Sequence, residues 1–306
     1  YILYRNPYYA VTQYYGVGTS DAQIVNQTFN VHNNSESVYE YLVTPSLVKT
    51  NDSSRGMPST IKNITITDAT NIPNGAFSNL KNIETITLAS TGSNVLTTIN
   101  SGAFYNLRLT SIQPTLVIPE SVTTIGTFVT TLSDYEILTL PTTVTTVGDH
   151  AFENSDKLVT VTINAKEDGS TKLGAYMFKD CDLLATVTHN GPIVNIPKYS
   201  FYDCYALTSF NAENQIRILA TTKTIGEYAF SFTPALVLDG TKTPQATSLM
   251  VPSTITSIGN NAFAYAIKLS DVTVSTTNLG VFMFKGCIGL KNYTLATATE
   301  TIPIGC

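Results

Sequence analysis

One repeated pattern constrains the fold of this chain more than any other feature: a small residue and then Phe, at a fixed distance after a branched or apolar residue. In residues 145–163 this apolar residue is Val147, taken as position 0, with Ala151 and Phe152 at positions +4 and +5. Position 0 recurs at Ile72, Ile99, Ile125, Val147, Leu173, Ile196, Ile225, Ile258 and Leu279. The gaps run from 21 to 33 residues. Such a period predicts a solenoid, because each unit buries its apolar face only by stacking on its neighbours.

Position +5 is Phe in eight of the nine repeats, and the Ile125 repeat has Thr130 there. The chain has 13 Phe, so most of them share one position, and their stacked rings are expected to form a continuous internal column. Position +1 is Gly or Pro in eight repeats, which we expect to turn the chain. The Phe residues concerned are Phe77, Phe104, Phe152, Phe178, Phe201, Phe230, Phe263 and Phe284.

The residues after each Phe suit a short helical turn, and a strand is expected to follow. Val161 and Ile163 share one face of this strand because they are two residues apart, while Thr160 and Thr162 share the other. The pattern predicts one parallel strand per repeat, with the strands joined in a single continuous sheet.

The segment V-P-S-T-I-T-S-I-G-N-N-A-F at residues 251–263 resembles the BspA-type leucine-rich repeat, I-P-x-x-V-x-x-I-G-x-x-A-F-x-x-C-x-x-L-x-x-V-x-I. The likeness covers roughly residues 57–306. It implies a leucine-rich-repeat right-handed superhelix in this part of the chain. It also implies a secreted or surface-anchored protein of microbes that live on mucosa, associated with adhesion and without catalytic repeat residues.

Residues 1–56 lack the repeat and hold eight of the 17 Tyr. We predict a Tyr-rich N-terminal cap or small β-hairpin region there, which would cover the open edge of a solenoid over residues 57–306. An aromatic binding patch is the alternative for the same residues.

The composition narrows the function. The net charge is −5 and the pI about 5.2, so no basic footprint for nucleic acid exists. No apolar run reaches the length of a membrane span. The chain begins at Tyr1 rather than Met, which we interpret as a mature or trimmed piece, so the lack of a signal peptide does not indicate a cytoplasmic protein.

The residue types that carry chemistry are sparse. The three His have no second ligand at metal spacing, and no hydrolase or phosphate-binding motif occurs, so we expect no catalytic residue, no cofactor and no metal. Three of the four Cys, at 181, 204 and 287, occupy position +8. We interpret them as small buried hydrophobes and disfavour a disulfide between the first two.

The outward strand positions are the candidate site. They form a ladder of hydroxyls on the inner, concave sheet face, which either binds an extended ligand or simply suits a half-exposed strand. The insertion loops, such as residues 164–172, are the alternative site. The predicted ligand-binding residues are Thr85, Thr87, Thr160, Thr162, Thr186, Thr188, Asp271 and Thr273.

These observations favour a secreted or cell-surface adhesion protein that binds a host or microbial surface protein or glycan. Two other classes stay open. One is a structural spacer of a larger surface protein, and the other is an enzyme with its site in residues 1–56 or in the insertion loops. The sequence does not determine the oligomeric state.

Overall fold

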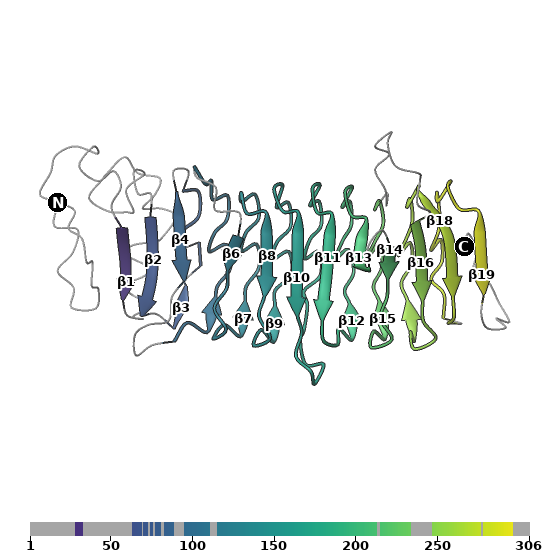
Figure 1. Ribbon diagram of the computed structural model, residues 1–306, viewed down its shortest axis with the longest axis horizontal. Helices are drawn as coiled ribbons and strands as arrows, with labels where there is room; N and C mark the ends of the chain where they lie inside the picture. Colours follow the sequence, from purple (N-terminus) through teal and green to yellow (C-terminus); the bar gives the residue numbers. More distant parts are fainter. Residues whose placement is uncertain are drawn as a thin grey trace, which may run out of the picture.

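The repeats stack into a parallel β-solenoid in the computed structural model of the chain, with the strands side by side along its long axis (Figure 1). The structure describes residues 28–32, 63–68, 70–72, 74–75, 77–80, 83–88, 95–110, 115–212, 215–233, 247–276 and 278–295. The predicted solenoid is therefore confirmed.

The main strands form two sheets rather than the single sheet expected. A three-stranded sheet holds β1 (Thr28–His32), β2 (Asn63–Asp68) and β4 (Thr85–Leu88). The rest lie in a nine-stranded sheet of β6 (Thr115–Val117), β8 (Ile137–Leu140), β10 (Thr160–Asn164), β11 (Thr186–Asn190), β13 (Ser209–Ala212), β14 (Gln215–Arg217), β16 (Thr247–Val251), β18 (Leu269–Val274) and β19 (Asn292–Leu295). The pairing is parallel except between β13 and β14. Within the described residues, no strand ladder joins β4 to β6, although the two strands are neighbours, so the expected single sheet is not continuous there.

Most repeats also contribute a second strand, which the sequence pattern did not predict. It has two residues, with position 0 buried and the residue before it at least partly exposed. These strands form two further parallel ladders, along the lower part of the row in Figure 1. One ladder holds β3 (Asn71–Ile72), β5 (Thr98–Ile99), β7 (Thr124–Ile125) and β9 (Thr146–Val147), and the other holds β12 (Asn195–Ile196), β15 (Thr224–Ile225) and β17 (Ser257–Ile258).

The predicted short helical turns were wrong: no helix occurs in the described residues. Between the short strand and the next long one, the backbone has positive φ at positions +3 and +7 in all nine repeats. His150 and Asn154 are one such pair, with φ of 59° and 53°. Two left-handed residues four apart prevent a right-handed helical turn from forming.

The backbone donors of this turn reach the next repeat instead. The N–H groups of His150, Phe152 and Asn154 donate to the carbonyls of Ala175, Met177 and Lys179 at 2.8–3.0 Å. Equivalent bonds recur from repeat to repeat, so the turn is itself a hydrogen-bonded ladder. This satisfies buried backbone groups that a helix would have satisfied internally.

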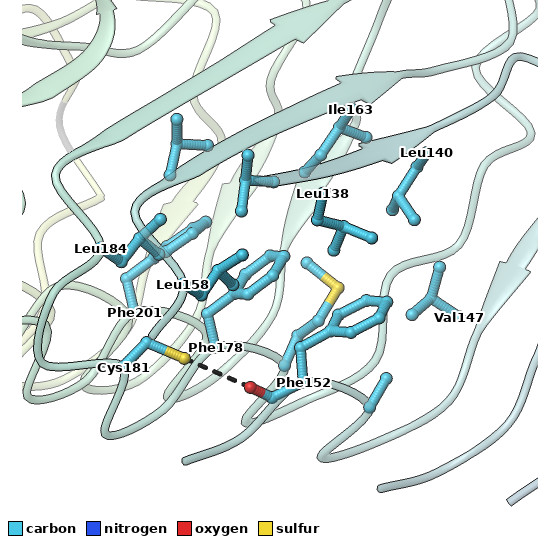
Figure 2. Close-up of a cluster of buried hydrophobic side chains, with 14 of the residues drawn as sticks. Leu138, Leu140, Val147, Phe152, Leu158, Ile163, Phe178, Cys181, Leu184 and Phe201 are labelled. Carbon is cyan, nitrogen blue, oxygen red and sulfur yellow. Dashed lines mark hydrogen bonds between the residues drawn. The ribbon is translucent and has the colours of Figure 1, made fainter. Parts of the chain in front are cut away.

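The interior is the predicted column of Phe rings. All eight Phe of position +5 are at most 6% exposed, and Figure 2 shows three of them in the core below the long sheet. Phe178 stacks on Phe152 at 5.3 Å and on Phe201 at 5.6 Å between ring centroids. The column is interrupted at Thr130, whose buried hydroxyl lies 3.2 Å from that of Ser155.

The cysteines of position +8 are free thiols, and each donates a hydrogen bond to the carbonyl of the Phe of the preceding repeat. Cys181 donates from Sγ to the carbonyl of Phe152 at 3.2 Å (Figure 2), and Cys204 donates likewise to that of Phe178 at 3.1 Å. Ser133 in an earlier repeat donates to the carbonyl of Phe104. Burial raises the pKa of both buried thiols well above the ordinary range, so they stay protonated and donate.

The glycine of position +1 allows the backbone of the preceding repeat to approach closely. A Cβ placed on Gly174 would lie 2.2 Å from the carbonyl oxygen of Gly148 in the preceding repeat. At Gly174 the backbones of adjacent repeats thus approach too closely for a side chain.

Candidate functional site

The outward face of the long sheet holds four of the predicted ligand-binding residues in register. Thr160 of β10 is paired with Thr186 of β11, and Thr162 with Thr188. All four are partly exposed, while the strand residues between them, Val161 and Val187, are fully buried. Since paired strands lie about 4.8 Å apart, the four threonines form a compact square of side chains.

These four hydroxyls make no hydrogen bond to another residue within the described part of the chain. Their donors and acceptors are therefore directed to solvent or to a ligand. The square ends at an amide ladder, because Asn190 donates from Nδ2 to Oδ1 of Asn164 at 2.8 Å. Hydroxyl and amide groups at fixed spacing suit a ligand with its own row of hydroxyl or peptide groups.

The other predicted residues do not join this square. Thr85 and Thr87 are exposed on β4, in the three-stranded sheet. Asp271 and Thr273 lie on β18, where Thr273 is paired with Met250, a side chain that is 51% exposed.

Apolar side chains interrupt the hydroxyl rows on the other side as well. Ile137 of β8 is paired with Thr160, and Val117 of β6 is paired with Thr139. Their exposed fractions are 38% and 65%. The ladder predicted from the sequence is thus a set of local clusters. The four central threonines are one of them, and Thr139 continues the row of Thr162 and Thr188.

The carboxylate of Asp271 accepts two side-chain hydrogen bonds. Ser270 donates to it, Asn292 donates from Nδ2 to Oδ1 at 2.6 Å, and these two hydrogen bonds lower the pKa of this carboxyl. Asp271 is therefore charged at neutral pH.

The loop of residues 164–172 is closed by one internal hydrogen bond and is joined to Val144 of the preceding repeat by another. The N–H of Lys166 donates to Oγ1 of Thr171 at 2.9 Å, and the hydroxyl of Thr171 donates to the carbonyl of Val144 at 3.3 Å. Glu167, Asp168 and Ser170 are exposed at its tip. The loop alternative therefore rests on these three polar side chains and on Lys172, which is also exposed.

Most of the N-terminal region lies outside the described residues, including its tyrosines, so the cap and the aromatic patch stay predictions. Within it, β1 pairs in parallel with β2 of the solenoid. The structure thus joins residues 28–32 to the first sheet.

Groups that could carry acid–base chemistry are scattered. His150 Nδ1 lies 2.7 Å from Glu153, and Lys179 donates to the same carboxylate at 3.2 Å. His189 is buried on the core side of β11, with Nε2 lacking a partner and Nδ1 3.2 Å from the carbonyl of Gly191. Burial lowers the pKa of His189, which keeps it neutral. No group of three or more His, Cys, Asp or Glu in the described ranges could hold a metal ion.

Sequence reasoning missed a column of partly exposed rings on the turn face. It holds the residues at position +3 of five successive repeats, with ring centroids 4.5–4.9 Å apart. The aligned repeats contained its signal, since aromatic residues replace Gly at one position. The column consists of Phe128, His150, Tyr176, Tyr199 and Tyr228.

All five residues of this aromatic column have positive φ, from 53° to 59°. Bulky residues reach this conformation at a cost of about 1–3 kcal/mol each. The same position holds Phe282 in the last repeat, and Gly75, Gly102 and Asn261 in the other three, and Gly and Asn adopt this conformation easily. Backbone geometry therefore does not explain the rings. Each stacked pair of rings stabilises the fold by about 0.5–1.5 kcal/mol, which offsets part of this backbone strain.

Comparison with known proteins agrees with this architecture. The sequence matches the family described as a BspA type Leucine rich repeat region (6 copies) over residues 24–132, 55–168, 128–238 and 241–306. The chain belongs to this family. The BspA-type match starts ahead of residue 57, where we placed the start of the solenoid, and it includes β1.

Among solved structures, a leucine-rich repeat protein from Bacteroides ovatus is 22% identical, with a TM-score of 0.55, over 78% of this chain and 65% of that protein. A leucine rich cell surface protein from Faecalibacterium prausnitzii is 18% identical, with a TM-score of 0.39, over 79% and 66% of the two chains. The pneumococcal vaccine antigen PcpA is 17% identical, with a TM-score of 0.41, over 78% of this chain and 58% of that protein.

At this level of identity the likeness to the Bacteroides ovatus protein concerns the fold alone. The BspA-type chain spans just under two thirds of that protein's length, at 65%. Among curated proteins, no sequence matches the chain. No helix of the described segments has the length and apolar character needed to cross a membrane.

Proposed function

We propose that this BspA-type chain is the binding part of a secreted or cell-surface protein, and that it attaches to a protein or glycan on a host or microbial surface without catalysis. The observation that carries the proposal is the square of Thr160, Thr162, Thr186 and Thr188 on the open face of the long sheet. Its hydroxyls have no partner among the described residues, and they sit on a rigid ladder of backbone hydrogen bonds. A preorganised face of this type lowers the entropy cost of binding an extended ligand.

The family supports the location, since the resemblance implies secretion or surface attachment. The solenoid form supports the activity, because stacked repeats present a long surface to partners. The low charge of the chain, 13% of residues, fits a face that binds through hydroxyl and amide groups.

The test is an array of immobilised extracellular-matrix proteins and neutral glycans, probed with the whole chain. A fourfold variant, Thr160→Val, Thr162→Val, Thr186→Val and Thr188→Val, keeps the shape of the square and removes its hydroxyls. We expect it to lose binding while its circular dichroism spectrum and melting temperature stay close to those of the parent, since outward strand residues affect stability little.

A second variant, Glu167→Ala with Asp168→Ala and Ser170→Ala, tests the loop. If the loop triple mutant loses binding and the threonine variant keeps it, the site belongs to the insertion loop and not to the sheet face. If the parent chain binds nothing on the array, the proposed adhesive function is wrong for these ligand classes.

A further inference from the structure

A second group of rings lies beside the aromatic column on the turn face. Phe232 and Tyr265 occupy position +7 of two adjacent repeats and stack with centroids 4.5 Å apart and planes inclined by 9°. Tyr202 joins this pair to the column, because its ring centroid is 5.4 Å from those of both Phe232 and Tyr199. The column and these three rings therefore form one connected surface, the aromatic surface, which extends from Phe128 to Tyr265.

Backbone conformation does not explain the rings at position +7 either. Phe232 and Tyr265 have φ of 57° and 60°, which bulky residues adopt only at a cost in strain. Asn79 and Asn106 hold the same position in the first two repeats, and Asn adopts this conformation more easily. All rings of the aromatic surface are at least partly exposed. Strained residues and exposed apolar patches both concentrate at binding sites, so this surface is a candidate for contact with a partner.

Two lysines of the chain itself show that cations fit over these rings. Nζ of Lys198 lies 5.5 Å from the ring centroid of Tyr176, and Nζ of Lys179 lies 5.8 Å from that of Tyr202. At these distances the electron-rich face of a ring attracts a cation. Lys179 also forms an ion pair with Asp180, so cations, carboxylates and rings already meet on this part of the turn face.

Carboxylates border the aromatic surface beside Tyr202. Desolvation raises the pKa of the Tyr202 phenol, and the charges of Asp203 and Asp180 raise it further. Desolvation likewise raises the pKa of the Asp182 carboxyl, and three neighbouring carboxylates add to the effect, those of Asp156, Asp203 and Asp180. Among the described residues, no cation forms an ion pair with Asp156, Asp182 or Asp203. This border therefore carries negative charge that the described chain leaves unbalanced.

We propose that the aromatic surface and its acidic border bind an Arg- and Lys-rich segment of a protein partner. The guanidinium group of Arg stacks on aromatic faces and pairs with carboxylates, so one residue type can use both parts of the surface. The unbalanced negative charge favours a basic partner over a neutral or acidic one. The rings and carboxylates are spread over several repeats at about 4.8 Å each, which suits an extended segment rather than a single small cation.

This inference goes beyond the proposed function, because it assigns a second surface that shares no residue with the threonine square. The two are tested separately. The fourfold threonine-to-valine variant of the sheet face should bind a basic peptide as the parent does, whatever it does on the array of matrix proteins and glycans.

The test is fluorescence anisotropy of a labelled peptide of alternating Arg and Ser, titrated with the whole chain at about 50 mM salt, where charge attraction is little screened. A peptide with Gln in place of Arg is the neutral probe. The aromatic variant, Tyr176→Asn with Tyr199→Asn, removes two rings and keeps a residue type that accepts positive φ. The acid variant, Asp156→Asn with Asp182→Asn, changes two exposed side chains.

A control variant, Glu167→Gln with Asp168→Asn, removes the same charge from the exposed loop of residues 164–172 and leaves the aromatic surface intact. We expect the parent to bind the Arg peptide at least about tenfold more tightly than the Gln peptide. The aromatic and acid variants should each weaken binding of the Arg peptide by about fivefold or more, and the control by less than about twofold.

The proposal is overturned if the parent does not bind the Arg peptide, or if it binds the Gln peptide equally well, which would assign the surface to a neutral partner. Equal losses in the acid variant and the loop control would reduce the binding to general charge attraction and also overturn it. Unchanged binding by a folded aromatic variant would do the same. Circular dichroism verifies folding, and the comparison of the acid variant with the loop control decides the question if the aromatic variant does not fold.

Discussion

Removing one ring from the middle of the Phe column tests how the solenoid is held together. Phe178 is fully buried and stacks on two rings, those of Phe152 and Phe201. Phe178→Ala should lower the free energy of unfolding by about 3–5 kcal/mol, the usual cost of deleting a buried Phe. About 1–3 kcal/mol of this comes from the two lost ring pairs, at about 0.5–1.5 kcal/mol each.

Phe77 is the matched control, because it is equally buried at 1% exposure and, among the described residues, stacks on one ring, that of Phe104, at 5.8 Å. Phe77→Ala should therefore cost less than Phe178→Ala, by about one ring pair, or 0.5–1.5 kcal/mol. Urea denaturation followed by circular dichroism and tyrosine fluorescence measures both, since the chain has no Trp. A Phe178→Ala variant within about 1 kcal/mol of the parent would refute the argument that the column stabilises the fold by burial and stacking.

Two further predictions concern single positions. Gly174→Ala should destabilise the chain by about 1–3 kcal/mol or more, because the added Cβ would meet the backbone of the preceding repeat. The control, Ser170→Ala on the exposed loop, should shift stability by less than about 0.5 kcal/mol. Equal urea midpoints for the two variants would show that adjacent repeats can move apart to accept the Cβ. Burial lowers the pKa of His189, so the unfolded chain takes up its proton first: stability should be unaffected above about pH 6.5 and should fall as the pH drops from there toward the lower folded-state pKa. His189→Leu should reduce this loss, and identical acid dependence of the urea midpoint in parent and variant would contradict it.

The sequence predicted the parts of the fold that depend on burial. Phe152 and its equivalents recur at one position because the interior accepts one large ring per repeat, and the alternation of Val161 with Thr160 and Thr162 fixed which strand face points outward. Both follow from side-chain type alone.

The turn and the site depended on relations between repeats, which residue type does not encode. Tyr176 and Phe128 give no sign of positive φ, since such residues rarely adopt it, and the acceptors of their N–H groups belong to other repeats. The hydroxyl ladder was predicted as continuous because outward Thr residues recur. Its interruption by Ile137 and Met250 became visible only with the strand register.

Because the hydrogen bonds of the turns all run in one direction, a whole repeat can be added to the solenoid without leaving a backbone group unbonded. Among the described residues, each turn but the last donates forward, from the N–H groups of residues such as Phe152 and Phe178, and each turn but the first accepts from the turn behind it. A complete extra turn inserted between any two existing ones would find acceptors ahead and donors behind, so duplication of one repeat leaves all neighbours satisfied. An insertion of a few residues inside the turn would break both sets of bonds at once. The number of repeats can therefore change by whole units, and the length of such a solenoid can vary without a new fold.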